Sequence, residues 1–134
     1  MAMEKKIYPR VAAHLPVVVT NEEGVRLRVL AIDTSSDGFS IQCSILQRNL
    51  MTPGGCYIRN GRPVELNAWL DLPLTGDRPL QVKARCNVEF SRRIARDRCE
   101  IGMRYKDLEG DGYENLIRFI ENRLASNEVT MLSL

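Results

Sequence analysis

The stretches that decide the fold are VELNAWLDL at residues 64–72 and LQVKARCNVEF at residues 80–90, in which apolar and polar side chains alternate. A period of two places the apolar side chains of a β-strand on one face and the polar ones on the other. Four other runs have the same strand character: residues 15–20, 25–32, 39–43 and 99–105. The pattern predicts an all-β fold, a six-stranded antiparallel β-barrel, because closure of the sheet removes its exposed edges.

The hydrophobic period changes near the C-terminus. Apolar side chains there recur at helical spacing, at Leu116, Ile117, Ile120 and Leu124, with Phe119 beside them. Asp111, followed by Glu114, is typical of a helix start, since carboxylates there accept hydrogen bonds from the free N–H groups of the first turn. We therefore expect an α-helix over residues 111–126 that packs its apolar stripe on the barrel.

Length and composition predict a single domain over residues 1–134. The chain is 44% hydrophobic and 27% charged, an ordinary globular composition. A domain of this length buries enough surface to fold without disulfides or metal ions. We expect a flexible ligand-binding arm over residues 1–14, the barrel over residues 15–106 and the helix over residues 111–126.

The cysteines and the N-terminal sequence predict a cytoplasmic protein without a metal site. Cys43, Cys56, Cys86 and Cys99 include no closely spaced pair, and His14 is the single histidine, whereas structural zinc sites draw on close pairs of ligands. The start MAMEKKIYPR lacks the apolar segment of a signal peptide, and no apolar run is long enough to insert into a membrane. We expect the thiols to pack mostly as small hydrophobic groups.

One candidate binding motif is KKIYPR at residues 5–10, just ahead of the first predicted strand. The guanidinium of Arg10 can grip phosphate oxygens, or the O6 and N7 edge of guanine, with two parallel hydrogen bonds. The ammonium of Lys6 can reach phosphate as a point charge. A basic arm of this kind suits an anionic ligand, although alone it also suits a solvated N-terminus.

A second candidate motif is DTSSDG at residues 33–38, between the second and third predicted strands. The carboxylate of Asp33 only accepts hydrogen bonds, so its two oxygens can take the N1–H and N2–H groups of guanine. Ser35 adds a hydroxyl, and Gly38 permits a positive φ where the chain turns back into a strand. Joined with the basic arm, this turn predicts a guanine-nucleotide site at the barrel mouth.

Together the two motifs resemble those of the PilZ domain family, the bacterial receptor modules for cyclic di-GMP. The family pattern R-x-x-x-R is matched by K-x-x-x-R at residues 6–10, and D/N-x-S-x-x-G is intact at residues 33–38. A late Gly-apolar-x-aromatic pattern of the family is matched by GMRY at residues 102–105. The resemblance spans residues 5–123 and implies a six-stranded barrel with a C-terminal helix, in agreement with the periodicity.

The resemblance implies a stand-alone cyclic di-GMP receptor that needs no cofactor and signals to an effector protein in motility, pilus or exopolysaccharide control. Arg10 would grip phosphate and guanine, Asp33 and Ser35 would contact a guanine, and Gly38 would shape the turn. The arm would fold over the ligand and so become ordered by it. The residues implied to bind cyclic di-GMP are Lys5, Lys6, Arg10, Asp33, Ser35 and Gly38. Neither nucleic acid nor membrane insertion is expected.

Two features depart from the family pattern. Lys6 stands in place of the first arginine, which keeps the charge but loses the planar guanidinium, so we expect a weaker affinity. Lys5 occupies the position associated in the family with binding one ligand or an intercalated pair, and it leaves the stoichiometry open. The connection over residues 44–63 is longer than a minimal hairpin, and a lid, a partner surface and a neutral insertion all remain open for it.

Two other functions stay open at this point. One is a PilZ-like protein-interaction module that has lost nucleotide binding. The other is a small barrel that binds nucleic acid through a basic loop with Arg92, Arg93, Arg96 and Arg98, although a net charge of +2 argues against it. An enzyme is not expected, because the chain has one histidine and neither a nucleophile elbow nor a phosphate loop. Trp69, on the polar side of its strand, either marks an interaction surface or packs under another segment.

Overall fold

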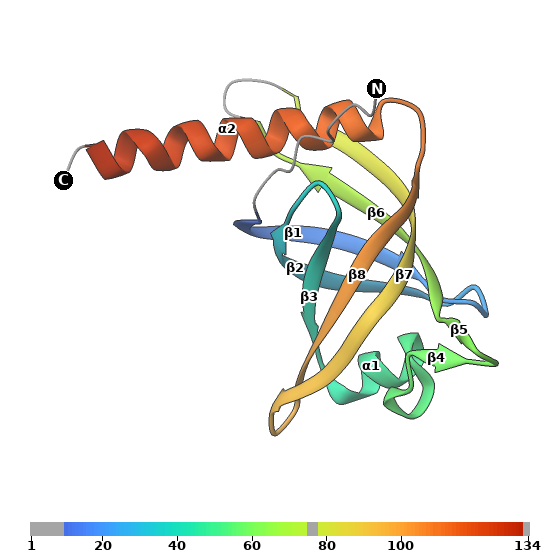
Figure 1. The fold of residues 1–134 in the computed structure, drawn as a ribbon. Helices are drawn as coiled ribbons and strands as arrows, with labels where there is room; N and C mark the ends of the chain where they lie inside the picture. Colours follow the sequence, from blue (N-terminus) through green and yellow to red (C-terminus); the bar gives the residue numbers. More distant parts are fainter. Residues whose placement is uncertain (1–9, 75–77, 133–134) are drawn as a thin grey trace, which may run out of the picture.

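The computed structural model describes residues 10–74 and 78–132, and within them six long strands close into an antiparallel barrel (Figure 1). Their order around the barrel is β1-β2-β3-β8-β7-β6. The bounds are β1 Val11–Thr20, β2 Arg26–Thr34, β3 Gly38–Cys43, β6 Glu65–Leu72, β7 Leu80–Ala95 and β8 Arg98–Leu108. The predicted six-stranded barrel is therefore confirmed.

The barrel interior is filled by the apolar side chains that the alternating pattern selects. Along β1, the inward side chains of Val11, Ala13, Leu15, Val17 and Val19 are all buried, whereas their neighbours are half-buried or exposed. The register between β6 and β7 pairs Leu66 with Cys86 and Leu70 with Val82. The two alternating stretches of sequence, residues 64–72 and 80–90, are therefore neighbouring strands. Burial of such side chains is the main term that stabilises the fold.

The C-terminal helix α2, Gly112–Leu132, lies across one end of the barrel, mainly over β7 and also against β1 and β6 (Figure 1). On the face of α2 that packs against the barrel, the side chains of Leu116, Phe119 and Ile120 are fully buried. The side-chain amide of Asn115 donates to the carbonyl of Gln81 over 3.0 Å and so fixes the first turns of the helix on β7. This confirms the predicted packing of the helix on the barrel. No helix within the described ranges is long and apolar enough to cross a membrane.

The connection between β3 and β6 has a structure of its own and lies at the opposite end of the barrel (Figure 1). It consists of α1 Ile45–Met51, a 3-10 turn over Pro53–Gly55, and the short pair β4 Ile58–Arg59 and β5 Arg62–Pro63. Ser44 and Gln47 form a reciprocal capping box at the start of α1. Met51 is buried in the hydrophobic core, so this segment packs against the end of the barrel and covers it.

Several expected boundaries are corrected. Helix α2 extends to Leu132 and does not end at residue 126, and β8 extends to Leu108 and does not end at residue 106. Strand β1 begins at Val11, so residues 11–14 belong to the barrel and not to the arm, because Val11 and Ala13 continue the buried stripe of the strand. Strand β7 continues to Ala95 and pairs with β8 up to Arg98. The basic segment predicted as a loop is therefore mostly a two-stranded extension of the sheet, which leaves residues 96–97 as its tight turn.

Three of the four thiols pack as small apolar groups, as expected. Cys43, Cys86 and Cys99 are buried, and Cys56 is exposed. Burial raises the pKa of the Cys43 and Cys86 thiols to about 12, so both stay protonated at neutral pH. These thiols contribute packing to the barrel and not charge.

Truncation of the helix anchor tests the packing described here. We expect Phe119→Ala to lower the free energy of unfolding by about 3–5 kcal/mol, because the phenyl ring is fully buried between α2 and the barrel. The matched control is Tyr113→Ala on the same helix, whose ring is exposed and whose loss should cost less than about 1 kcal/mol. Urea denaturation followed by circular dichroism measures both, and equal losses would show that α2 does not depend on this anchor.

Candidate functional site

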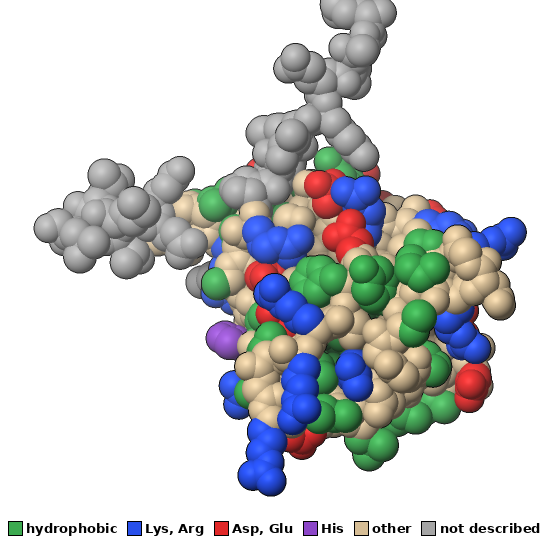
Figure 2. Space-filling model, turned by 60° about the horizontal axis from the view of Figure 1, so that its bottom comes forward, with side chains coloured by type: hydrophobic (Ala, Val, Ile, Leu, Met, Phe, Trp, Pro, Cys, Tyr) green, Lys and Arg blue, Asp and Glu red, His purple; other side chains and the backbone are tan. Residues whose placement is uncertain are grey.

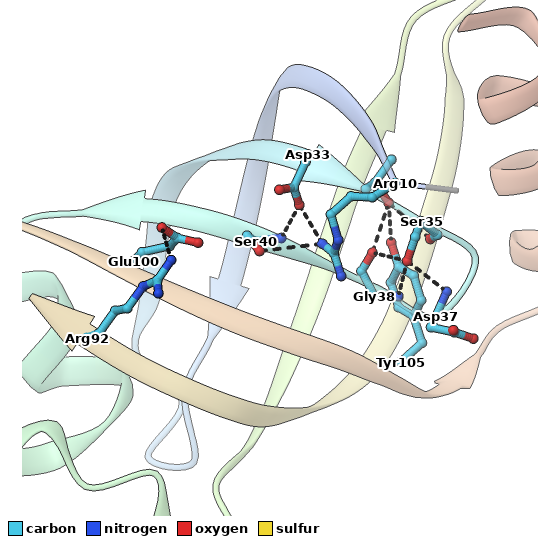
Figure 3. A network of polar contacts seen from close by, with 10 residues as sticks. Arg10, Asp33, Ser35, Asp37, Gly38, Ser40, Arg92, Glu100 and Tyr105 are labelled. Carbon is cyan, nitrogen blue, oxygen red and sulfur yellow. Dashed lines mark hydrogen bonds and ion pairs between the residues drawn. The ribbon is translucent and has the colours of Figure 1, made fainter. Parts of the chain in front are cut away.

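Arg10 and Asp33, separated by 23 residues in sequence, form an ion pair at one rim of the barrel (Figure 3). The Nη1 atom of Arg10 lies 2.5 Å from Oδ1 of Asp33. The same carboxylate oxygen accepts a hydrogen bond of 3.0 Å from the backbone N–H of Ser40. The fold therefore brings the last residue before β1, the end of β2 and the middle of β3 to one point.

Irregular pairing places Asp33 where it can reach Arg10. The β1–β2 register shifts between Ala12 and Leu15, and the β2–β3 register shifts between Ala31 and Asp33. Such bulges bend a strand and redirect its side chains, and they are common beside binding sites. As a result the Asp33 side chain is only 23% exposed, whereas that of Arg10 is 45% exposed. The site presents a half-exposed guanidinium above a more shielded carboxylate.

Ser35 organises the turn that follows β2. Its backbone N–H donates to the carbonyl of Gly38 over 2.8 Å, which closes the turn. Its hydroxyl oxygen accepts from the backbone N–H groups of Asp37 and Gly38 at 3.2 and 3.3 Å. Ser35 is buried, so the hydroxyl that was predicted to contact a guanine is engaged with the backbone of its own turn in this structure.

Gly38 is required for a reason other than the one expected. Its φ is not positive, unlike that of five other glycines in the described ranges. Gly38 instead pairs with Arg104 across β3 and β8, where a Cβ atom would lie 1.9 Å from the carbonyl oxygen of Met103. A close approach of two backbones, and not a left-handed turn, therefore excludes every larger residue at this position.

Thr34 and Tyr105 form a polar contact beneath the turn that the sequence analysis missed. The Oγ1 atom of Thr34 lies 3.2 Å from the phenol oxygen of Tyr105, and the backbone N–H of Tyr105 donates to the carbonyl of Asp37 over 2.8 Å. Burial raises the pKa of Tyr105 well above its usual value, so the phenol is neutral and can donate. Tyr105 is the aromatic residue of the GMRY segment, which was the available signal for this role.

A shallow floor of small residues extends from Arg10 toward Phe90. Nη1 of Arg10 lies 3.4 Å from the Ser40 hydroxyl, and Ser40 pairs with Gly102 across β3 and β8. A Cβ atom on Gly102 would meet the Phe90 ring at 2.1 Å, so this ring lies directly over Gly102 on the outer surface. Arg10 and Phe90 thus stand on either side of the Ser40–Gly102 pair.

An arginine continues this surface beyond Phe90. The guanidinium of Arg92 lies 5.2 Å from the centre of the Phe90 ring and forms an ion pair of 3.2 Å with Glu100. Figure 2 shows a face of the molecule on which Lys and Arg side chains lie around hydrophobic ones. Charged and aromatic groups therefore lie together, an arrangement suited to planar anionic ligands.

The structure thus brings four of the six predicted site residues together: Arg10, Asp33, Ser35 and Gly38. Lys5 and Lys6 lie outside the described residues. Within the described part of the chain, no group of three or more His, Cys, Asp or Glu side chains is placed to hold a metal ion. The candidate site consists of the Arg10–Asp33 pair, the turn at residues 35–38 and the floor that leads to Phe90.

No family model matches this sequence, and no curated protein matches it either. Among solved structures, the chain is similar to Bacillus subtilis inhibitor of motility (MotI/DgrA), with a TM-score of 0.67 and 16% sequence identity over 93% of this chain. That match covers 53% of MotI/DgrA, so the chain spans about half of its length. The PilZ domain of CeSA from a cellulose-synthesizing bacterium aligns over 84% of this chain and 94% of that domain, with 20% identity and a TM-score of 0.46.

The comparison with MotI/DgrA concerns the fold alone, because the sequence identity is low. The shared architecture is a closed antiparallel barrel with a C-terminal helix. The fold is PilZ-like, and the predicted fold class is confirmed.

Substitution at the turn tests the close approach of β3 and β8. We expect Gly38→Ala to destabilise the barrel by about 1–3 kcal/mol, since the added methyl group would overlap the Met103 carbonyl and force the strands apart. Gly112→Ala is the control, because its added Cβ would lie 3.5 Å from Cβ of Leu108, an ordinary van der Waals contact. Thermal unfolding measures both variants, and a Gly38→Ala protein as stable as the control would refute this reading of the turn.

Proposed function

We propose that the chain is a receptor for cyclic di-GMP that acts as an adaptor toward an effector protein. The observation that carries the proposal is the convergence of Arg10 and Asp33 at one rim of the barrel. A guanidinium binds phosphate or the O6 and N7 edge of guanine, and a carboxylate accepts the N1–H and N2–H groups of the same base. A ligand that is both a phosphodiester and a guanine nucleotide uses both groups at once.

The ion pair between Arg10 and Asp33 would open when the ligand binds. Opening costs little, because an ion pair this exposed to solvent contributes only about 0–1 kcal/mol to stability. Hydrogen bonds from guanine to the carboxylate would replace the one from Arg10, and phosphate would replace the carboxylate as the partner of Arg10. The backbone N–H of Ser40 would keep the Asp33 side chain in place meanwhile.

The remaining parts of the site have supporting roles in this proposal. Ser35 and Gly38 hold the turn, Phe90 offers a ring on which a base can stack, and Arg92 adds a cation beside that ring. Lys5 and Lys6 would reach the phosphates as the arm closes over the ligand. No catalytic residue enters the proposal, and we place the receptor in the cytoplasm.

Titration calorimetry with cyclic di-GMP tests the proposal. We expect binding to the wild-type protein at ligand concentrations up to about 100 μM, and at least about tenfold weaker binding to Arg10→Ala and to Asp33→Ala, the loss expected for one good bidentate contact. Arg59→Ala is the matched control, because Arg59 is equally exposed and paired with Glu22 but lies on β4. Its affinity should equal that of the wild type.

The outcomes of this titration distinguish a cyclic di-GMP receptor from a protein-interaction module that does not bind nucleotide. Absence of binding to the wild-type protein would contradict the receptor function and leave a protein-interaction module. Equal binding to all four proteins would place the ligand elsewhere on the barrel.

Lys6, which stands in place of the first arginine of the family pattern, offers a second test. We expect Lys6→Arg to tighten cyclic di-GMP binding by up to about tenfold, because the planar guanidinium adds a second hydrogen bond and a stacking face that an ammonium lacks. Lys6→Met, which keeps the length and loses the charge, should weaken binding. A Lys6→Arg protein that binds no better than the wild type would remove this residue from the site.

A further inference from the structure

A groove of about 540 Å³ lies on the outer surface of β1, β2, β6 and β7, away from the residues of the proposed nucleotide site. Its middle is a row of outward side chains that the strand registers place side by side. Arg28 pairs with Val18 across β2 and β1, Val18 pairs with Trp69 across β1 and β6, and Trp69 pairs with Lys83 across β6 and β7. The groove therefore crosses four strands of the barrel.

The floor of this groove is apolar and centred on the single tryptophan of the chain. Trp69 is 42% exposed although it is the largest side chain in the sequence. Pro16 and Val18 line the groove beside it, and the ammonium of Lys83 lies 4.2 Å from the centre of the indole ring. The indole is thus partly exposed in the groove, which favours the interpretation of Trp69 as part of an interaction surface. An exposed aromatic side chain in a concave site is typical of a docking surface.

The walls of the groove carry more positive than negative charge. They include Arg26, Arg28, Lys83 and Arg85, against Asp71 and Glu109. Arg85 is neutralised by ion pairs with Glu65 and Asp107. Arg26, Arg28 and Lys83 form no ion pair with any residue that the structure describes. Three cations therefore line the groove around Trp69 without a carboxylate partner in the described part of the chain.

We propose that this groove binds an acidic segment of a partner protein, with an apolar side chain of that segment seated against Trp69. Charge complementarity to the three unpaired cations selects an acidic sequence, and the apolar floor selects an aliphatic or aromatic anchor. The walls carry only a small excess of positive charge, less than the continuous backbone charge of a nucleic acid calls for, which favours a short acidic peptide. The groove supplies the partner contact that the proposed adaptor function needs.

A synthetic peptide tests the groove, and it is titrated without nucleotide so that a failure here is distinct from a failure of cyclic di-GMP binding. The probe is an acidic nonapeptide with a central Leu-Phe pair and without Trp or Tyr. Because the chain contains one tryptophan, its fluorescence reports directly on occupancy of the groove. We expect a saturable change in the emission of Trp69 that weakens as salt is added.

Two charge reversals and two controls define the surface. We expect Lys83→Glu and Arg28→Glu each to weaken peptide binding at least about tenfold, since a like charge would face the acidic segment. Arg59→Glu on β4 and Arg62→Glu on β5, both outside the groove, should bind as the wild type does. A second peptide with Ala-Ala in place of Leu-Phe should also bind at least about tenfold more weakly, because it lacks the anchor for Trp69.

Several results would overturn the proposal. They are an unchanged Trp69 emission up to about 1 mM peptide, equal binding by the charge-reversed proteins, and equal binding of the Ala-Ala peptide. Tighter binding of a single-stranded oligo-dT than of the acidic peptide, lost in Lys83→Glu, would assign the groove to nucleic acid instead. A concentration-dependent dimer that shields Trp69 and excludes the peptide would assign it to a second copy of the chain.

Discussion

The close approach of β3 and β8 is the constraint on which the candidate site depends. At Gly38 the backbone of Met103 occupies the space of a side chain, and at Gly102 the ring of Phe90 occupies it. Both positions lie on the same strand pair, separated by two residues of the ladder. Because glycine stands at both positions, the Met103 backbone can lie against the turn at residues 35–38 and the Phe90 ring can lie over the strand pair beside Ser40 and Arg10.

The barrel surface has two regions to which we assign binding functions. One is the rim at which Arg10 and Asp33 meet, where polar groups of three strands converge. The other is the groove centred on Trp69, where four strands present their outward side chains. Strands β1 and β2 contribute to both.

The sequence predicted the barrel and the C-terminal helix because each element must bury one face. Burial of one face produces a period in the apolar residues that can be read from the sequence. It also predicted that Arg10 and Asp33 belong to one binding site, through the resemblance of the two motifs. Features that depend on distant strands escaped it. The role of Gly38 depends on the distance to a strand that is remote in sequence, the continuation of β7 through its arginines depends on pairing with β8, and the position of Phe90 depends on a bulge between Val88 and Phe90. Each is a tertiary effect that no local pattern records.

The most direct test of the central claim is a titration of the isotope-labelled protein with cyclic di-GMP, followed by NMR of the backbone amides. The N–H of Ser40 donates to the Asp33 carboxylate, so its resonance reports any exchange of the Arg10–Asp33 ion pair for a ligand. The account predicts shifts at Ser40 and in the turn at residues 35–38, with no shift along β4 and β5. Absence of any shift at Ser40, or shifts confined to other strands, would contradict it.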